Sequence, residues 1–261
     1  MKQLAAFFFL LSAAAPALAQ DELVGVRLRE WYARMSGTIE AEENNSGSTR
    51  LDLANDLGLG NQNWTTELQA YLKIPVVGRI YLGWWQAHDS GSETLTRTIS
   101  FGGQTFTSST QVDSDVTLDV GYLMYEFALP VIPLGDLVSL EIGASAGVRV
   151  FRGHGKIEGG GLDADEQGTA GLPTLGAHVT LRLFNTVRFE AEVLGLVFSY
   201  SDHDINYLEG FIEATVEPLP WIFVGAGYKF AMLNYDFDDG KDSAHLALDI
   251  AGFYLTVGVR F

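Results

Sequence analysis

The 261-residue sequence contains no cysteine, so neither disulfides nor thiolate metal or redox chemistry can belong to this fold. After its first twenty residues it has no apolar run near the roughly 20 residues that a transmembrane helix needs. Basic residues are also scarce, with 16 Lys and Arg against 33 Asp and Glu and a formal net charge of −17. This acidic balance argues against a nucleic-acid partner, because the phosphates would be repelled.

The N-terminal stretch has the pattern of a secretory signal peptide. Lys2 gives it a positive start, an apolar run extends from Leu4 to Ala15, and Ala17-Leu18-Ala19 supplies the small-x-small cleavage pattern. We therefore predict a signal peptide over residues 1–19 and a single domain over residues 20–261, since all-β barrels of 200 to 250 residues commonly form one domain.

The last eleven residues, 251–261, alternate with the period of two that is typical of a β-strand. One face is small, polar or charged and includes Thr256 and Arg260. The other face is wholly apolar and consists of Phe253, Leu255, Val257, Val259 and Phe261. A membrane barrel would turn this apolar face to lipid and the polar face to its lumen.

Nine further segments of about ten residues or more show related alternation. Their connections alternate between short, often proline-containing turns and long, acidic, glycine-rich loops. This pattern predicts an all-β fold, a transmembrane antiparallel up-and-down β-barrel of ten strands, with eight or twelve strands as alternatives. Both chain ends then fall on the short-turn side.

Four local expectations accompany this fold. Apolar residues change face along the first strand, which predicts a bulge near Arg29-Glu30. Residues 51–59 fit neither strand nor helix, so we expect an excursion folded over or into the barrel mouth. Residues 88–112 and 152–171 are predicted as long loops, the first with a protruding hairpin. The tryptophans and some tyrosines, including Trp31, Trp85 and Tyr254, are expected in interface girdles.

In these features the sequence resembles the outer-membrane β-barrel proteins of Gram-negative bacteria. The resemblance covers nearly all the chain after the signal peptide and is most specific in the terminal strand that ends in Phe261. It implies an outer-membrane monomer whose partners are outer-membrane lipid and lipopolysaccharide, with divalent cations as bridges to the acidic loops. It also implies that the barrel assembly machinery recognises the apolar face of residues 253–261.

Charged side chains on the predicted inward faces are balanced between the two signs. Because charges in a narrow lumen must be paired or hydrated, they predict a network that fills the interior and a structural or surface-interaction role. A narrow pore for small solutes is the alternative. The predicted lumen residues are Glu67, Lys73, Arg79, Asp119, Glu141, Arg149, Arg182, Arg188, Glu190, Glu192, Glu209, Glu213, Lys229 and Arg260.

A surface hydrolase is the second alternative. His88-Asp89 and Asp202-His203-Asp204 lie at predicted strand ends, where histidine beside carboxylates could activate water. Ten strands with such a cluster resemble omptin-type surface proteases, although Asp-His-Asp replaces the Asp-x-His element of that family. A lipid-modifying hydrolase would need serine, histidine and an acid on one outer face, where His245 is the candidate. The acidic loop 236–242 lacks EF-hand spacing, and no metal or cofactor is predicted.

Overall fold

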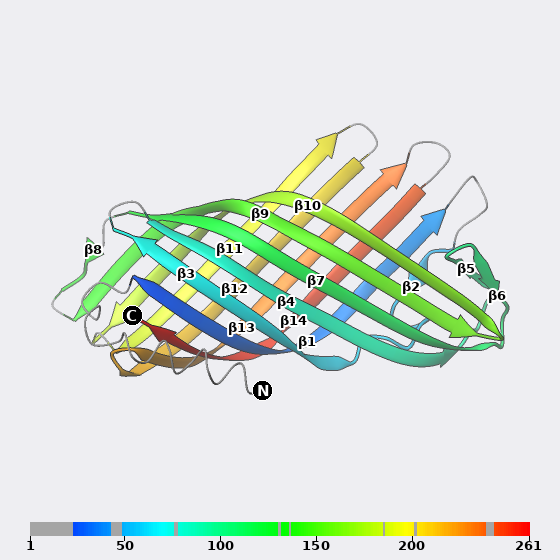
Figure 1. Cartoon of the computed structure of the whole chain (residues 1–261), viewed down its shortest axis with the longest axis horizontal. Coiled ribbons are helices and arrows are strands. Elements are labelled where there is room, and N and C mark those ends of the chain that lie inside the picture. Colours follow the sequence, from blue (N-terminus) through cyan, green and yellow to red (C-terminus); the bar gives the residue numbers. More distant parts are fainter. Residues whose placement is uncertain are drawn as a thin grey trace.

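Ten long strands form a closed antiparallel ring in the computed structural model (Figure 1). The structure describes residues 23–42, 49–75, 78–129, 132–135, 137–184, 186–200, 203–238 and 243–261. The predicted signal peptide lies outside these residues. The wall strands are β1 (Val24–Glu42), β3 (Gln62–Ile74), β4 (Gly78–Thr94), β7 (Gln111–Ala128), β9 (Val138–Gly159), β10 (Leu162–Leu183), β11 (Val187–Tyr200), β12 (His203–Leu219), β13 (Ile222–Asp238) and β14 (Ser243–Arg260).

Each strand pairs with its neighbour in sequence, and β14 closes the ring against β1. Backbone hydrogen bonds between Val24 and Phe261, of 3.0 and 2.8 Å, complete this seam at its end. Both described termini lie at the end of the barrel that carries the short connections, which we call the turn end; the opposite end is the loop end (Figure 1). Within the described residues no helix is long and apolar enough to span a bilayer.

The pairing register fixes the stagger of the ring. A path that crosses the ladder once around the barrel leaves β10 at Thr169 and returns to it at Leu181, a displacement of 12 residues. For ten strands this stagger corresponds to a strand tilt of roughly 40°. Because the displacement is even, every strand keeps one face inward around the whole ring.

The remaining strands are short. β2 (Leu51–Asp52) pairs with β1, and β8 (Ile132–Pro133) pairs with β9 at the turn end. β5 (Ile99–Phe101) and β6 (Gln104–Phe106) form the hairpin predicted within residues 88–112. The other predicted long loop, 152–171, is instead a regular extension of β9 and β10 that turns at Gly160-Gly161, where positive φ angles suit glycine.

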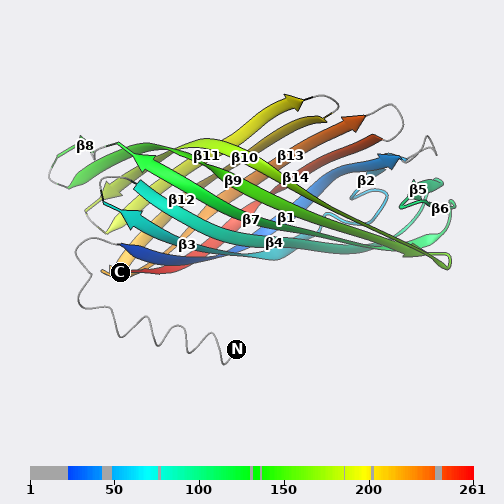
Figure 2. The same cartoon turned by 45° about the horizontal axis from the view of Figure 1, so that its top comes forward.

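The wall divides at the loop end. β10 pairs with β9 along its whole length but with β11 only from Leu175 to Leu183. On the opposite side, pairing between β3 and β4 begins only at Thr66. The upper parts of β4, β7, β9 and β10 therefore form one lobe, and those of β11 to β14 with β1 form another. The two lobes diverge in both views (Figures 1 and 2).

Three sequence expectations about faces were wrong. β1 pairs with β14 and β3 without a register shift, so there is no bulge at Arg29-Glu30. Instead Arg27, Arg29 and Trp31 share the inner face, all buried. Trp31, Trp85 and Tyr254 lie inside the barrel rather than in an outer girdle. On β7 the apolar side chains of Leu118 and Val120 face inward, so the predicted orientation of that strand was inverted.

Candidate functional site

The lower half of the lumen, toward the turn end, is filled by a network of paired charges that we call the ionic layer. Its centre is Glu67 on β3. One carboxylate oxygen accepts a hydrogen bond from Lys229 at 2.9 Å, and the other accepts one from the Tyr122 hydroxyl at 2.7 Å and lies 3.5 Å from Arg29. Glu67, Lys229 and Arg29 are each no more than 2% exposed, so these contacts replace water around three buried charges.

Two neighbouring groups extend the ionic layer across the lumen. Glu213 accepts a hydrogen bond from Arg29 at 3.1 Å and lies 3.5 Å from Arg27. Arg149 donates to Glu209 at 3.1 Å, and its guanidinium lies 4.6 Å from the ring centroid of Tyr122. Each buried cation therefore has at least one carboxylate, and several also have an aromatic face.

A third group lies closer to the turn end. Arg79 donates to Glu141 at 2.6 Å and lies 3.2 Å from Glu126. Nε2 of His178 lies 3.6 Å from Glu126 and 4.0 Å from Glu141. Together Glu126, Glu141 and His178 place ligand atoms within 4.8 Å of one another, as a metal ion would require. Arg79 pairs with both carboxylates, whereas both ring nitrogens of His178 are buried without a hydrogen-bond partner among the described residues.

The ionic layer leaves almost no free volume. The cavity enclosed by Arg29, Glu67, Arg149, Glu190 and Glu209 measures about 20 Å³. This volume accommodates about one water molecule. The buried side chains of the ionic layer therefore fill the lumen at this level.

Most of the predicted lumen residues lie on inner faces, but three occupy different surroundings. Asp119 is on the outer face of β7, where its carboxylate accepts a hydrogen bond from Gln86 at 2.9 Å; its placement in the lumen was wrong because β7 was inverted. Lys73 is exposed at the end of β3. Arg260 is buried at the turn end and pairs with Glu217. The remaining inner-face residues are Glu67, Arg79, Glu141, Arg149, Arg182, Arg188, Glu190, Glu192, Glu209, Glu213 and Lys229.

Sequence reasoning missed Arg27, Arg29, Glu126 and His178 as members of the ionic layer. Arg27 and Arg29 follow the same period of two as Trp31 on β1, but a lumen-facing tryptophan was not anticipated. Glu126 was missed with the inverted face of β7. The alternation of β10 did place His178 opposite its apolar face, and this signal could have found it.

An aromatic layer covers the ionic layer on the side of the loop end. Trp31 and Trp85 meet edge to face, with ring centroids 5.7 Å apart. The ammonium of Lys229 lies 5.2 and 5.3 Å from these two rings, which links the layers. Phe151 and Tyr207 pack in the same way at 5.1 Å. From this level toward the loop end the lumen is lined mainly by apolar side chains.

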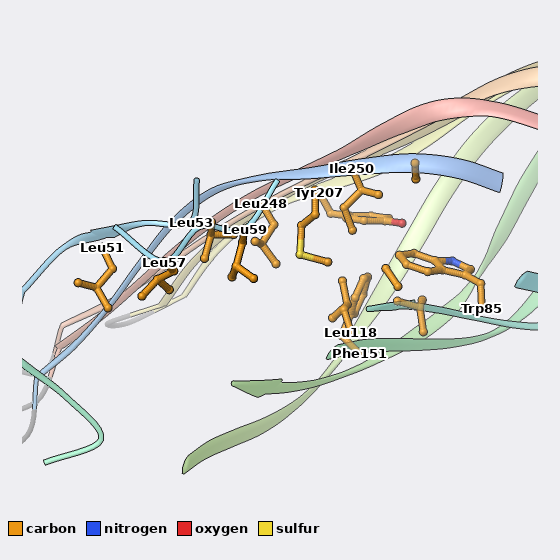
Figure 3. Close-up of a cluster of buried hydrophobic side chains, with 14 of the residues drawn as sticks. Leu51, Leu53, Leu57, Leu59, Trp85, Leu118, Phe151, Tyr207, Leu248 and Ile250 are labelled. Carbon is orange, nitrogen blue, oxygen red and sulfur yellow. The ribbon is translucent and has the colours of Figure 1, made fainter. Parts of the chain in front are cut away.

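Above the aromatic layer, residues 51–60 form a plug inside the barrel mouth. Leu51, Leu53, Leu57 and Leu59 are at most 4% exposed and join the same hydrophobic cluster as Leu118 and Phe151. Figure 3 shows the four leucines in a row, with Leu53 and Leu59 nearest to Leu248 of β14. The sequence expectation that this stretch folds over or into the barrel mouth is confirmed, with the four leucine side chains buried.

Asp52 and Asp89 hold the plug in place. The Asp52 carboxylate accepts hydrogen bonds from the backbone N–H groups of Ala54 and Asn55 at 3.0 and 2.8 Å, which caps the turn. Asp89, buried on the inner face of β4, accepts from the Gly60 N–H at 2.6 Å and from the Asn63 amide at 2.8 Å. These bonds satisfy backbone donors that the lumen would otherwise leave without partners.

Arg97 connects the plug to the β5–β6 hairpin segment. It donates to Asp56 at 2.7 Å and to the backbone oxygen of Arg50 at 2.6 Å. Burial alone would raise the pKa of the Asp56 carboxyl, but the hydrogen bonds from Arg97 and from the Asp52 backbone lower it on balance. Asp56 is therefore ionised at neutral pH and holds the two loop segments together.

The hydrolase candidates that the structure describes do not come together in one site. His88 is on the outer face of β4, 3.1 Å from the Thr117 hydroxyl, whereas its neighbour Asp89 is inside and engaged with the plug. Asp202 and the side chain of His203 lie outside the part of the chain that the structure describes. His245 contacts Asp236 through Nδ1 and Arg50 through Nε2. Charged side chains therefore contact both ring nitrogens of His245.

An apolar cavity of about 560 Å³ lies between the plug and the diverging lobes, and we call it the mouth cavity. Its volume falls within the range of small-molecule pockets. Polar groups such as His154 and Lys156 occur along its rim. Its apolar lining includes Leu53 and Leu57 of the plug, Phe151 of β9, Leu172 of β10, Leu233 of β13 and Leu248 of β14.

The outer face of β14 carries the five residues of the predicted assembly signal. Phe253, Leu255 and Val257 are 73, 62 and 45% exposed, and Val259 and Phe261 follow them toward the turn end. These side chains lie beside the seam that β14 forms with β1. A protein that recognises these side chains would contact them from outside the barrel.

Comparisons with known proteins find only distant likenesses. No family model matches the chain, and no curated protein matches it significantly. Among solved structures, the outer membrane protease OmpT from Escherichia coli aligns with a TM-score of 0.48 and 10% identity over 93% of this chain and 98% of that chain. The translocator domain of the autotransporter NalP from Neisseria meningitidis aligns with a TM-score of 0.43 and 13% identity over 100% of this chain and 98% of that chain. The attachment invasion locus protein Ail of Yersinia pestis aligns with a TM-score of 0.33 and 11% identity over 92% of this chain and 99% of that chain. Scores this low transfer neither an activity nor a partner to this chain.

Proposed function

We propose that this chain is an integral outer-membrane barrel that does not conduct solutes and that binds a ligand at its outer mouth. The observation that carries the proposal is the double closure of the lumen, by the ionic layer and by the plug, beneath an open apolar cavity. A pore would need a continuous aqueous path, and the void of about 20 Å³ argues against one.

Membrane placement is supported by the outer surface. Side chains such as Leu82, Leu175 and Ile212 are 63, 67 and 62% exposed, which is costly in water but favourable against lipid. Tyr32 and Trp64, with ring centroids 5.1 Å apart, lie on the outer face as interfacial aromatics do. Toward the loop end the outer face becomes polar, for example at Asp119 and His88.

The orientation follows from the lengths of the connections. Outer-membrane barrels have short periplasmic turns and long external loops. The turn end of this barrel would then face the periplasm, and the plug, the mouth cavity and the acidic hairpins would face outward. Contact of the acidic loops with lipopolysaccharide through divalent cations and recognition of β14 by the assembly machinery remain predictions.

The absence of cysteine allows a direct topology experiment. Asp163→Cys lies near the tip of the β9–β10 hairpin and Lys73→Cys lies at the turn end; both positions are exposed. In intact cells a membrane-impermeant maleimide should label only the first, and both should react after the outer membrane is permeabilised. Labelling of Lys73→Cys in intact cells, or recovery of the protein in the soluble fraction, would contradict the proposal.

A further inference from the structure

The barrel wall has a gap between β10 and β11 beside the mouth cavity. Among the described strands, the part of β10 before Leu175 pairs only with β9, and the part of β11 after Gly195 pairs only with β12. Residues 166–172 of β10 line the mouth cavity along this edge, and Thr169, Ala170 and Gly171 are exposed. The cavity is therefore open toward the side of the barrel as well as toward the outside.

The gap begins within the part of the outer surface that carries exposed apolar side chains. On one side of it Val148 and Val150 of β9 face outward and are 45 and 46% exposed. On the other side Val197 of β11 is 80% exposed, the highest value among the large apolar side chains. Side chains of this kind on both flanks indicate that hydrocarbon, rather than water, borders the lower part of the opening.

The mouth cavity offers an apolar interior, and no cation among the described residues that line it is available to an anionic head group. Lys156 is paired with Glu158 at 2.5 Å and lies 3.5 Å from Asp163, and His154 contacts Asp165 at 2.8 Å. An anionic head group would therefore meet cations that are already neutralised, in a strongly acidic protein. A hydrocarbon chain would bury apolar surface and require no polar partner.

We infer that the mouth cavity holds one acyl chain of an outer-leaflet lipid, which enters sideways through the gap between β10 and β11 while its head group stays at the membrane surface. This inference rests on the membrane placement proposed above. The chain would pack against Leu172, Leu233 and Leu248 and would cover the apolar upper side of the plug.

Two glycines provide a matched pair of variants for the test. Gly153 lines the mouth cavity, and a Cβ added there meets no atom within 4 Å, so Gly153→Trp can fill the cavity without a backbone clash. Gly121 also has no atom within 4 Å of an added Cβ, but its position on β7 alternates with the buried Val120 and Tyr122 and faces outward. Gly121→Trp is therefore the control for an added indole away from the cavity.

The probe is a phosphatidylcholine with a diazirine near the end of one chain, present in vesicles that contain the refolded barrel. After illumination, mass spectrometry locates the adducts. We expect adducts on outer-face residues such as Leu175 and Ile212 and also on inner-face residues such as Leu233 and Leu248. Gly153→Trp should reduce the inner adducts at least tenfold and leave the outer ones unchanged, whereas Gly121→Trp should retain the inner adducts.

Three outcomes would overturn the inference. Inner-face adducts could be missing from the wild type, they could survive Gly153→Trp, or they could form with a diazirine-labelled free fatty alcohol but not with the phospholipid. The last result would assign the cavity to a free amphiphile. Loss of the outer-face adducts as well would instead contradict the membrane placement, so the two failures can be distinguished.

Discussion

The two halves of the lumen are closed by opposite chemistry. Toward the turn end, Arg29, Glu67 and Lys229 are buried in a network that depends on exact pairing of charges. Toward the loop end, the leucines of residues 51–60 close the mouth by apolar packing, which depends on volume and shape. The ionic half is enclosed by the complete ring of strands, whereas the apolar half lies where the wall divides and leaves a cavity. Both halves close the lumen, but only the apolar half leaves a cavity, which we propose to be the binding site.

The largest decrease in the free energy of unfolding is expected from a substitution that disrupts the ionic layer. Glu67→Leu would leave Lys229 and Arg29 without their central carboxylate, and removing one partner of a buried pair costs about 3–5 kcal/mol. Urea unfolding of the barrel in vesicles measures the change. Glu67→Gln keeps the shape and should cost less, and the outer-face control Asp119→Asn should remain within about 0.5 kcal/mol of the wild type. Equal effects of Glu67→Leu and Asp119→Asn would remove the distinction between the inner and outer faces.

A substitution in the plug should lower the free energy of unfolding by less than one in the ionic layer. Leu53→Ala deletes a buried side chain that borders an existing cavity, so we expect about 2–3 kcal/mol, the lower part of the usual range for such truncations. The loss should appear as faster hydrogen exchange in residues 51–60, with little change in β11 to β13. Uniform loss of protection throughout the ring would mean that the plug and the wall unfold as one unit.

A substitution of Asp89 tests whether this residue has a structural or a catalytic role. Asp89→Asn keeps one acceptor but weakens the bonds to Gly60 and Asn63, with an expected cost of about 1–2 kcal/mol. Exchange of the Gly60 amide should accelerate, and the matched neighbour His88→Asn should leave it unchanged because His88 faces outward. A peptidase or esterase activity that disappears in both variants would instead restore the hydrolase alternative.

The smallest expected effect is the pH dependence of the stability of the plug. The folded-state pKa of Asp56 is lowered, so its link to Arg97 contributes stability above the unfolded value of about 4 and loses it as the pH falls through the lower folded value. Between pH 5 and pH 8 the plug should therefore not respond. Hydrogen exchange of the Asp56 segment as a function of pH tests this, with Asp56→Asn as the variant that abolishes the dependence. A transition near pH 6 would point to a histidine instead.

The period of two in the sequence predicted the ten strands, the closure and the alternation of short and long connections. It could not say which face of each strand points inward, because that inference assumed a lumen polar along its whole length. The assumption holds for β9, where Arg149 opposes Val148, and fails for β7, where Leu118 and Val120 fill an apolar upper lumen. The mouth cavity exists because the β10–β11 ladder ends at Leu175. No local sequence pattern in either strand predicts the residue at which this pairing ends.

The most direct measurement is the conductance of the refolded barrel in a planar bilayer, for the wild type and for Leu53→Ala/Leu57→Ala. Heat-modifiable migration on gels establishes that both are folded. Our account predicts that both are silent, because the ionic layer closes the lumen even when the plug is loosened. Discrete, ion-selective openings in the wild type would contradict it and would establish the chain as a pore.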